Sequence, residues 1–145
     1  MSVSTREYSC IGRAIVLDTG ALLAGIHLSS PCKTYTTSLV LREVRDEESR
    51  AALERALESG KLEVLDPPPG VVESPTSRRL SEADVSILAL ALYFKRLGLE
   101  PLVFTDDYAL QEELASRNVS FRPVRYKGSR AYRRATRGES SVYEA

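Results

Sequence analysis

Residues that bind soft metals are scarce in this chain, which has one histidine and two cysteines among its 145 residues. Cys10 and Cys32 form no CxxC pair, so the sequence predicts no zinc site and no thiolate or imidazole cluster. A reducing, cytoplasmic compartment is therefore expected. No apolar run is long enough to cross a bilayer and no signal-peptide pattern opens the chain, so we expect no membrane partner.

The chain also has no net charge, because 20 basic residues balance 20 acidic ones. The chain as a whole therefore lacks the excess of basic residues typical of nucleic-acid-binding proteins. Hydrophobic residues make up 43% of the chain, which is enough to fill the core of one domain of this length without disulfides. The sequence thus predicts a single domain whose charges are unevenly distributed.

Strand and helix patterns alternate from residue 13 onward. The strands at 14–17 and 102–105 are almost wholly apolar, as expected for strands buried on both faces of a parallel sheet. Further strands are expected at 33–36, 62–65 and 119–124, and helices at 21–24, 39–44, 47–58, 81–97 and 108–117, while residues 71–80 fit a short helix or a loop. This alternation predicts an α/β fold with three α/β/α layers: a parallel sheet of four to five strands with helices on both faces.

Acidic residues stand at the ends of these elements. Asp18 follows the strand at 14–17, and Asp106 and Asp107 follow the strand at 102–105, so all three are expected at the carboxyl edge of the sheet. Asp84 lies in the first turn of the helix at 81–97, and Glu43 lies on the apolar face of the helix at 39–44. Each aspartate also fits a simpler role as a helix cap, and Glu43 also fits an ion pair with a neighbouring arginine.

Together these acids predict more than capping. Carboxylates gathered at one edge repel one another unless a cation lies among them. Because the ligands are oxygens only, the sequence favours a hard cation, Mg²⁺ or Mn²⁺, of the kind that holds phosphates and activates water.

Four stretches in this order resemble the PIN domain, a small metal-dependent nuclease fold. They are IVLDTGALLAG at 15–25, TTSLVLREV at 36–44, LSEADVSILALAL at 80–92 and VFTDDYALQ at 103–111. The last two are more similar to the archaeal and eukaryotic Nob1-type endoribonucleases of small-subunit ribosomal RNA maturation than to VapC-type toxins. The resemblance implies a PIN domain over 13–124, preceded by an N-terminal arm at 1–12 and followed by a basic tail at 125–145. Nob1-type proteins usually carry a zinc ribbon, and this sequence contains no CxxC motif for one.

The resemblance also implies roles for individual residues. The metal-binding and catalytic acids would be Asp18, Glu43, Asp84 and Asp107, with Asp106 sharing or replacing the role of Asp107. Thr19 and Thr105 match the small hydroxyl residues that support the family's metal site. Relatives hydrolyse single-stranded RNA and leave a 5′-phosphate and a 3′-hydroxyl.

Although the chain has no net charge, its basic residues are concentrated near the C-terminus. Residues 117–138 contain eight basic residues and no acid, with Tyr126 and Tyr132 among them. Arginine interleaved with tyrosine can pair with phosphates and stack on unpaired bases, although a solvated tail without a partner fits as well. The candidate RNA contacts are Arg122, Arg125, Lys127, Arg130, Arg133 and Arg134.

Three other functions fit parts of the same pattern. A VapC-type toxin ribonuclease would use the same acids and be held by an antitoxin. A non-catalytic PIN-fold module would dock only RNA or ribosomal partners. The resemblance also implies a homodimer as a partner, because PIN domains commonly dimerise. A phosphotransfer domain of the receiver or haloacid type is suggested by Asp18 and the 106–107 pair, but the sequence lacks the D-x-D motif of the haloacid family.

Overall fold

A five-stranded parallel sheet forms the centre of the molecule. The computed structural model describes residues 9–72 and 79–125. The strands are β1 (Arg13–Leu17), β2 (Thr34–Thr36), β3 (Leu62–Val64), β4 (Glu100–Phe104) and β5 (Ser120–Arg122), in the order β3-β2-β1-β4-β5. The α/β fold and the five-stranded parallel sheet expected from the sequence are confirmed.

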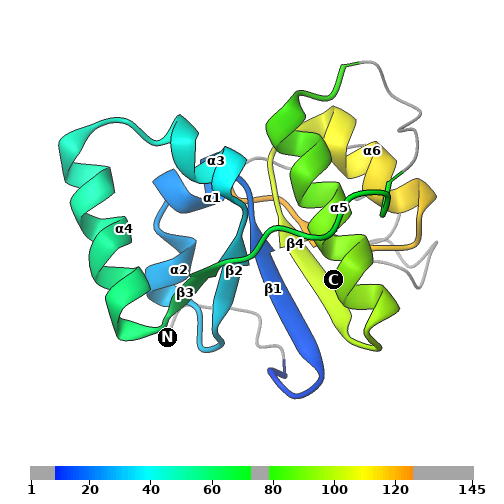
Figure 1. Cartoon of the computed structure of the whole chain (residues 1–145), viewed down its shortest axis with the longest axis horizontal. Coiled ribbons are helices and arrows are strands. Elements are labelled where there is room, and N and C mark those ends of the chain that lie inside the picture. The colour runs from blue at the N-terminus through cyan, green and yellow to red at the C-terminus, as the bar shows by residue number, and fades with distance from the viewer. Residues whose placement is uncertain (1–8, 73–78, 126–145) are drawn as a thin grey trace.

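Helices connect every pair of successive strands. They are α1 (Thr19–Leu23), α2 (Ile26–Ser29), α3 (Ser38–Glu43), α4 (Glu47–Ser59), α5 (Glu82–Arg96) and α6 (Tyr108–Ser116). The chain steps from β1 toward β3 at one edge, then crosses back to β4 and on to β5 at the other. Right-handed crossovers in opposite directions place helices on opposite faces of the sheet. In Figure 1, α5 lies in front of the sheet over β4, with α4 beside β3.

The core explains why β1 and α5 are so apolar. Ile15, Val16 and Leu17 are fully buried, and α5 buries Ile87, Leu88 and four other residues against β1 and β4. A strand flanked by strands and covered by helices on both faces needs an unbroken apolar run. The β1 run therefore ends where the sheet ends, and the next residue, Asp18, emerges at its carboxyl edge.

Most element boundaries lie within two residues of the expected ones. The strand expected at 102–105 begins earlier, at Glu100, because residues 100–104 pair along the whole of β1. The stretch 71–80 was open between helix and loop, and its described residues (71–72 and 79–80) belong to neither helix nor strand. Residues 73–78 lie outside the described part of the chain.

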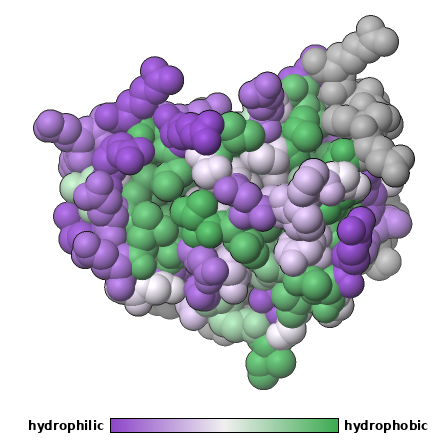
Figure 2. Space-filling view, viewed as in Figure 1, coloured by the Kyte–Doolittle hydropathy of each residue, from purple (hydrophilic) through white to green (hydrophobic). Residues whose placement is uncertain are grey.

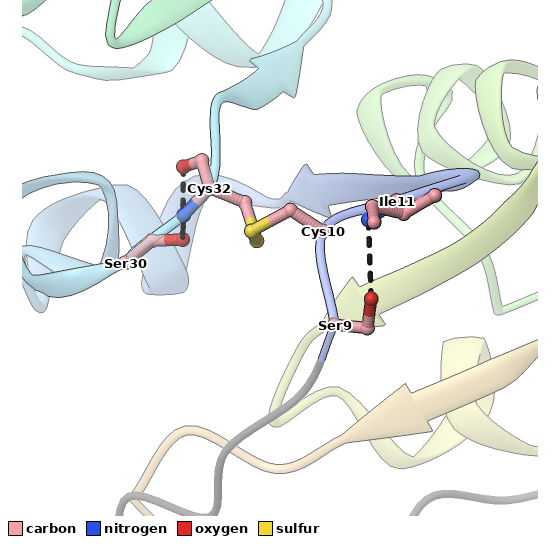
Figure 3. Close-up of a disulfide and its surroundings, with 5 residues drawn as sticks. All are labelled: Ser9, Cys10, Ile11, Ser30 and Cys32. Carbon is pink, nitrogen blue, oxygen red and sulfur yellow. Dashed lines mark hydrogen bonds between the residues drawn. A yellow bond between two sulfur atoms is a disulfide. The ribbon is translucent and has the colours of Figure 1, made fainter.

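The two cysteines form a disulfide that the sequence analysis did not expect. Cys10 and Cys32 are joined with their Cα atoms 5.5 Å apart, across 22 residues of chain. They meet because β1 and β2 are parallel neighbours, so the segments that enter the two strands lie side by side (Figure 3). The sequence analysis expected a core that needs no disulfide, so it gave no reason to pair the two cysteines.

Residues 65–72, which follow β3, cross the front of the molecule in Figure 1. Figure 2 shows apolar side chains gathered in the middle of this face, with polar ones around them. A groove of about 640 Å³ lies between residues 66–72 of this crossing, the start of α3 and the first two turns of α5. None of the five candidate acids lines it, so the groove and the acidic edge are separate features. No helix in the described part of the chain is long and apolar enough to span a membrane.

Candidate active site

Asp18 stands at the end of β1 and begins α1. Its Oδ1 accepts a hydrogen bond from the backbone N–H of Ala21 at 2.8 Å, so the residue caps α1 as the simpler interpretation expected. The side chain is only 7% exposed. Capping fixes the carboxylate at the carboxyl edge of the central strand, where a parallel sheet exposes its ligand site.

Thr105 connects Asp18 to Asp107. β1 and β4 are neighbours paired up to Leu17 and Phe104, so the residues that follow them meet at the edge. The Thr105 hydroxyl donates to the Asp18 carboxylate and accepts from the backbone N–H of Asp107 at 3.0 Å. One buried hydroxyl therefore sets the position of both acids.

Asp107 in turn caps α6 and faces Asp84. Its Oδ1 accepts from the N–H of Leu110 at 3.0 Å. Asp84 lies in the first turn of α5, in a capping box with Ser81. Burial, and then the charge of Asp107 and a hydrogen bond with it, raise the pKa of Asp84 to about 6.

Glu43 reaches the same edge from the last turn of α3. Its Oε1 accepts a hydrogen bond from the hydroxyl of Thr19, the residue next to Asp18. The alternative that Glu43 pairs with a neighbouring arginine is not what the structure shows. Contacts of α3 with α1 and α5 hold this helix beside the elements that carry Asp18 and Asp84.

The carboxylate of Asp106 binds backbone N–H groups that follow β5. Its Oδ1 accepts from the backbone N–H of Val124 at 2.6 Å and of Arg125 at 3.1 Å, and its Oδ2 accepts from Arg125 at 3.0 Å. Of the two neighbouring aspartates, Asp107 is thus the one that faces Asp84. The charge of Asp106 nonetheless acts on Asp18.

The electrostatics of the edge follow from these distances and burials. Burial raises the pKa of Asp18, hydrogen bonds from Thr105 and Ala21 lower it, and the charges of Asp106 and Asp107 raise it again. Acids made harder to ionise by burial and by one another are suited to a cation. In the described residues, however, no three acidic, histidine or cysteine side chains lie in an arrangement that could hold a metal ion. The acids are bonded instead to hydroxyls, backbone N–H groups and one another.

Two of the six candidate RNA contacts fall in the described part of the chain. Arg122 ends β5, and its carbonyl oxygen accepts from the N–H of Thr105 at 3.0 Å. Arg125 is exposed and follows at the same edge. The other four, Lys127, Arg130, Arg133 and Arg134, lie outside the described residues, as does most of the tail.

The sequence analysis assigned no role to Gln111. This side chain is fully buried, and its Nε2 donates to the carbonyl oxygen of Thr105 at 2.7 Å. It therefore holds the backbone from which the Thr105 hydroxyl projects. The sequence did contain a signal for this role, because Gln111 is a polar residue on the apolar face of α6, four residues after the capping Asp107.

Several known proteins are similar to this chain in sequence. Residues 15–94 match the family described as the PIN domain of ribonuclease. A ribonuclease named VapC3 from Aeropyrum pernix is 41% identical over 138 residues, which cover 89% of this chain and 99% of that protein. Endoribonucleases named Nob1 are 32% identical in Methanothermobacter thermautotrophicus, covering 88% of this chain and 80% of that one, and 33% identical in Pyrococcus abyssi, covering 77% and 68%. With its parallel sheet and its acidic carboxyl edge, the chain belongs to the PIN-domain family of ribonucleases.

Proposed function

We propose that this protein is an Mg²⁺- or Mn²⁺-dependent endoribonuclease that hydrolyses phosphodiester bonds in single-stranded RNA. One observation supports the proposal above all: four candidate carboxylates from four different elements lie along the carboxyl edge of the sheet in a chain of this family. A structural role explains the caps of Asp18, Asp84 and Asp107 one by one. It does not explain why all of them, with Glu43, occupy one edge.

The donor set fits a hard divalent cation. Asp18, Glu43, Asp84 and Asp107 supply only oxygen ligands, and the raised pKa values of Asp18 and Asp84 express repulsion and burial that a cation relieves. A bound cation would supply Lewis-acid chemistry at the phosphodiester and lower the pKa of water near it.

The remaining residues of the edge position these acids. Thr105 orients Asp18 and Asp107 through one hydroxyl, Thr19 orients Glu43, and Gln111 fixes the backbone of Thr105. Such supporting bonds usually alter metal affinity or activity by about 10–100-fold when removed. The one histidine, His27, is buried and neither of its ring nitrogens has a hydrogen-bond partner, so we assign it no role in the chemistry.

Arginine side chains would hold the RNA phosphates. Arg122 ends β5 and Arg125 follows it at the acidic edge. In the sequence, Lys127, Arg130, Arg133 and Arg134 come next among the basic residues. Each phosphate that such a residue neutralises makes binding more sensitive to salt. We therefore expect RNA affinity to fall steeply as the salt concentration rises.

Two biological settings are supported by named relatives. The resemblance to Nob1-type proteins favours a role in small-subunit ribosomal RNA maturation in the cytoplasm. The relative named VapC3 is matched over almost its whole length, which favours a VapC-type ribonuclease paired with an antitoxin. Growth arrest on expression, relieved by a neighbouring small protein, would select the second setting. Unaffected growth together with cleavage of precursor ribosomal RNA would select the first.

The test is cleavage of structured and unstructured RNAs by the purified chain with Mn²⁺, Mg²⁺ or EDTA, followed by mapping of the ends. We expect 5′-phosphate and 3′-hydroxyl ends with metal and no cleavage in EDTA. Asp18→Asn should reduce the rate by about 100-fold or more, as expected for loss of a metal ligand. Glu112→Gln, an exposed acid of α6, is the matched control and should cleave normally. RNA binding without any cleavage would instead identify a non-catalytic PIN-fold module.

A further inference from the structure

A row of hydroxyl hydrogen bonds joins the start of α3 to the first turn of α5. Thr37, the N-cap of α3, is fully buried, and its Oγ1 accepts from the backbone N–H of Val40 at 3.3 Å. The same Oγ1 lies 2.7 Å from the Oγ of Ser86, and Ser86 donates to the carbonyl oxygen of Ala83 at 2.6 Å. Because the single hydroxyl proton of Ser86 goes to Ala83, Thr37 is the donor in the bond between the two hydroxyls.

This row of bonds connects the two elements that carry Glu43 and Asp84. Glu43 is the last residue of α3, and Asp84 directly follows Ala83 in α5. α3 has six residues and is therefore about 9 Å long. A helix this short is not stable alone and keeps its place through its contacts, which for α3 include α5. The position of Glu43 relative to Asp84 thus depends on how α3 is fixed against α5.

Helix capping alone does not account for the bond between Thr37 and Ser86. The start of α3 is held a second time, because Asp66 accepts a hydrogen bond from the backbone N–H of Ser38 at 2.9 Å. Ser86 is the one polar residue in the stretch 85–92, where an alanine or leucine would favour the helix more. A hydroxyl at this position gains a partner on α3 that an apolar side chain would not have.

We infer that Thr37 and Ser86 are positioning residues for the metal site: the bond between their hydroxyls fixes α3 against α5 and so sets the separation of Glu43 from Asp84. The inference rests on the proposed function and deepens it. Two ligands from different helices bind one cation well only when the residues behind them keep the helices at a constant spacing.

Ser86→Ala in the full-length protein is the decisive variant, because it breaks the bond between the helices and leaves the cap of α3 in place. Alanine favours the helix, so the melting temperature should change by about 3 °C or less. The affinity for Mn²⁺, measured by isothermal titration calorimetry without RNA, should fall about tenfold. Cleavage should be slow at an Mn²⁺ concentration that saturates the wild type and should recover at about tenfold more Mn²⁺. An unchanged affinity for Mn²⁺ would overturn the inference.

Substitutions of Thr37 test the other half of the bond. Thr37→Ser keeps the hydroxyl and should bind Mn²⁺ like the wild type, whereas Thr37→Val should bind it at least as weakly as Ser86→Ala. Since both changes break the same bond, adding Ser86→Ala to Thr37→Val should weaken binding no further. Fully additive losses would show that the two side chains act separately, and the inference would then be wrong.

Thr34 provides a matched control at the other end of β2. It is also fully buried, and its hydroxyl donates to the carbonyl oxygen of Lys61 at 2.9 Å. Thr34→Val removes a buried threonine hydroxyl that does not contact α3 or α5, and it should leave the affinity for Mn²⁺ unchanged. A loss as large as that of Ser86→Ala would mean that Mn²⁺ binding follows overall stability, which would overturn the inference.

Asp66→Ala separates capping from positioning, because it removes a hydrogen bond at the start of α3 and keeps the one between Thr37 and Ser86. Its affinity for Mn²⁺ should stay within about threefold of the wild type, and a tenfold loss would contradict the inference. Should the wild type bind no Mn²⁺, the proposed function fails, and the inference that rests on it is overturned too. Equal binding by the wild type and Ser86→Ala overturns the inference alone.

Discussion

Asp84 illustrates a conflict between stability and chemistry at a single residue. Burial and the charge of Asp107 raise its pKa to about 6 from an ordinary 3.8. The folded protein therefore binds a proton more tightly than the unfolded chain, and the stability that this proton provides is lost as pH rises from about 4 to about 6. At neutral pH the ionised side chain opposes folding.

Replacing Asp84 by asparagine should remove that opposition. We expect the melting temperature of Asp84→Asn to exceed that of the wild type by about 3 °C at pH 8 and to equal it near pH 4, while RNA cleavage is lost. Thermal unfolding across this pH range, followed by circular dichroism, measures both effects. Glu82→Gln, an exposed acid in the same turn, is the control and should show no such difference. A less stable Asp84→Asn at pH 8 would contradict the electrostatic account.

His27 has the opposite dependence on pH. The ring is 3% exposed, and neither of its nitrogens has a hydrogen-bond partner. Burial, and to a lesser extent the charge of Lys61, lower the pKa of His27. Below pH 6.5 the unfolded chain takes up a proton that the folded protein refuses, so stability falls as pH decreases through this range.

His27→Leu should reduce this loss of stability in acid. We expect the variant to be more stable by about 1 kcal/mol at pH 7, because two unsatisfied polar atoms are removed, and the gain should be larger at pH 5. Urea denaturation at the two values of pH provides the comparison. A gain that is the same at pH 5 and pH 7 would show that the imidazole does not titrate during unfolding.

At the scale of secondary structure elements, capping residues and catalytic candidates coincide at one end of the sheet. Asp18 caps α1, Ser81 and Asp84 cap α5, and Asp107 caps α6. The termini of these helices therefore depend on the same side chains as the site. α4, by contrast, is capped by Asp46 at its start and by Gly60 at its end, and neither of these is a candidate acid of the site.

Two substitutions that cost similar amounts of stability should distinguish the capped start of α5 from the capped end of α4. Ser81→Ala removes the cap of α5 and Gly60→Ala places a side chain at φ 82°, and each should lower stability by about 1 kcal/mol. Only Ser81→Ala should also reduce cleavage, since Asp84 loses its partner. The two measurements are urea denaturation and the initial rate of RNA cleavage. Equal activity in both variants would show that the cap does not position Asp84.

Periodicity explains why the elements were predictable and the contacts were not. The apolar runs of β1 and β4 and the buried face of α5 are local signals, and they gave the parallel sheet and placed Asp18 at its edge. The choice between Asp106 and Asp107 depends on Val124 and Arg125, which are nearly 20 residues away. No local pattern carries that information. The buried Gln111 was overlooked for the same reason, because its partner is a backbone carbonyl that only the fold brings to it.

At the scale of the whole molecule, the candidate acids and the disulfide lie at opposite edges of the sheet. The carboxyl ends of the strands carry the acids, and the disulfide joins the segments that enter β1 and β2 at the amino ends. Disulfides are unusual in reducing compartments, although intracellular proteins of hyperthermophiles contain them. Because this bond lies at the amino ends of the strands and the acids at the carboxyl ends, we expect it to contribute to stability and not to the chemistry of the acids.

Reduction of the disulfide should consequently destabilise the protein without stopping cleavage. Closing a loop of 22 residues limits the unfolded chain, and opening it should cost about 3 kcal/mol of unfolding free energy. Urea denaturation with and without a reductant measures this cost, and cleavage is assayed at a temperature where both forms are folded. A variant with Cys10 and Cys32 both changed to serine should match the reduced wild type and no longer respond to reductant. If reduction abolished cleavage by a protein that is still folded, the amino edge would have to influence the acids across the sheet, and the separation of the two edges would be wrong.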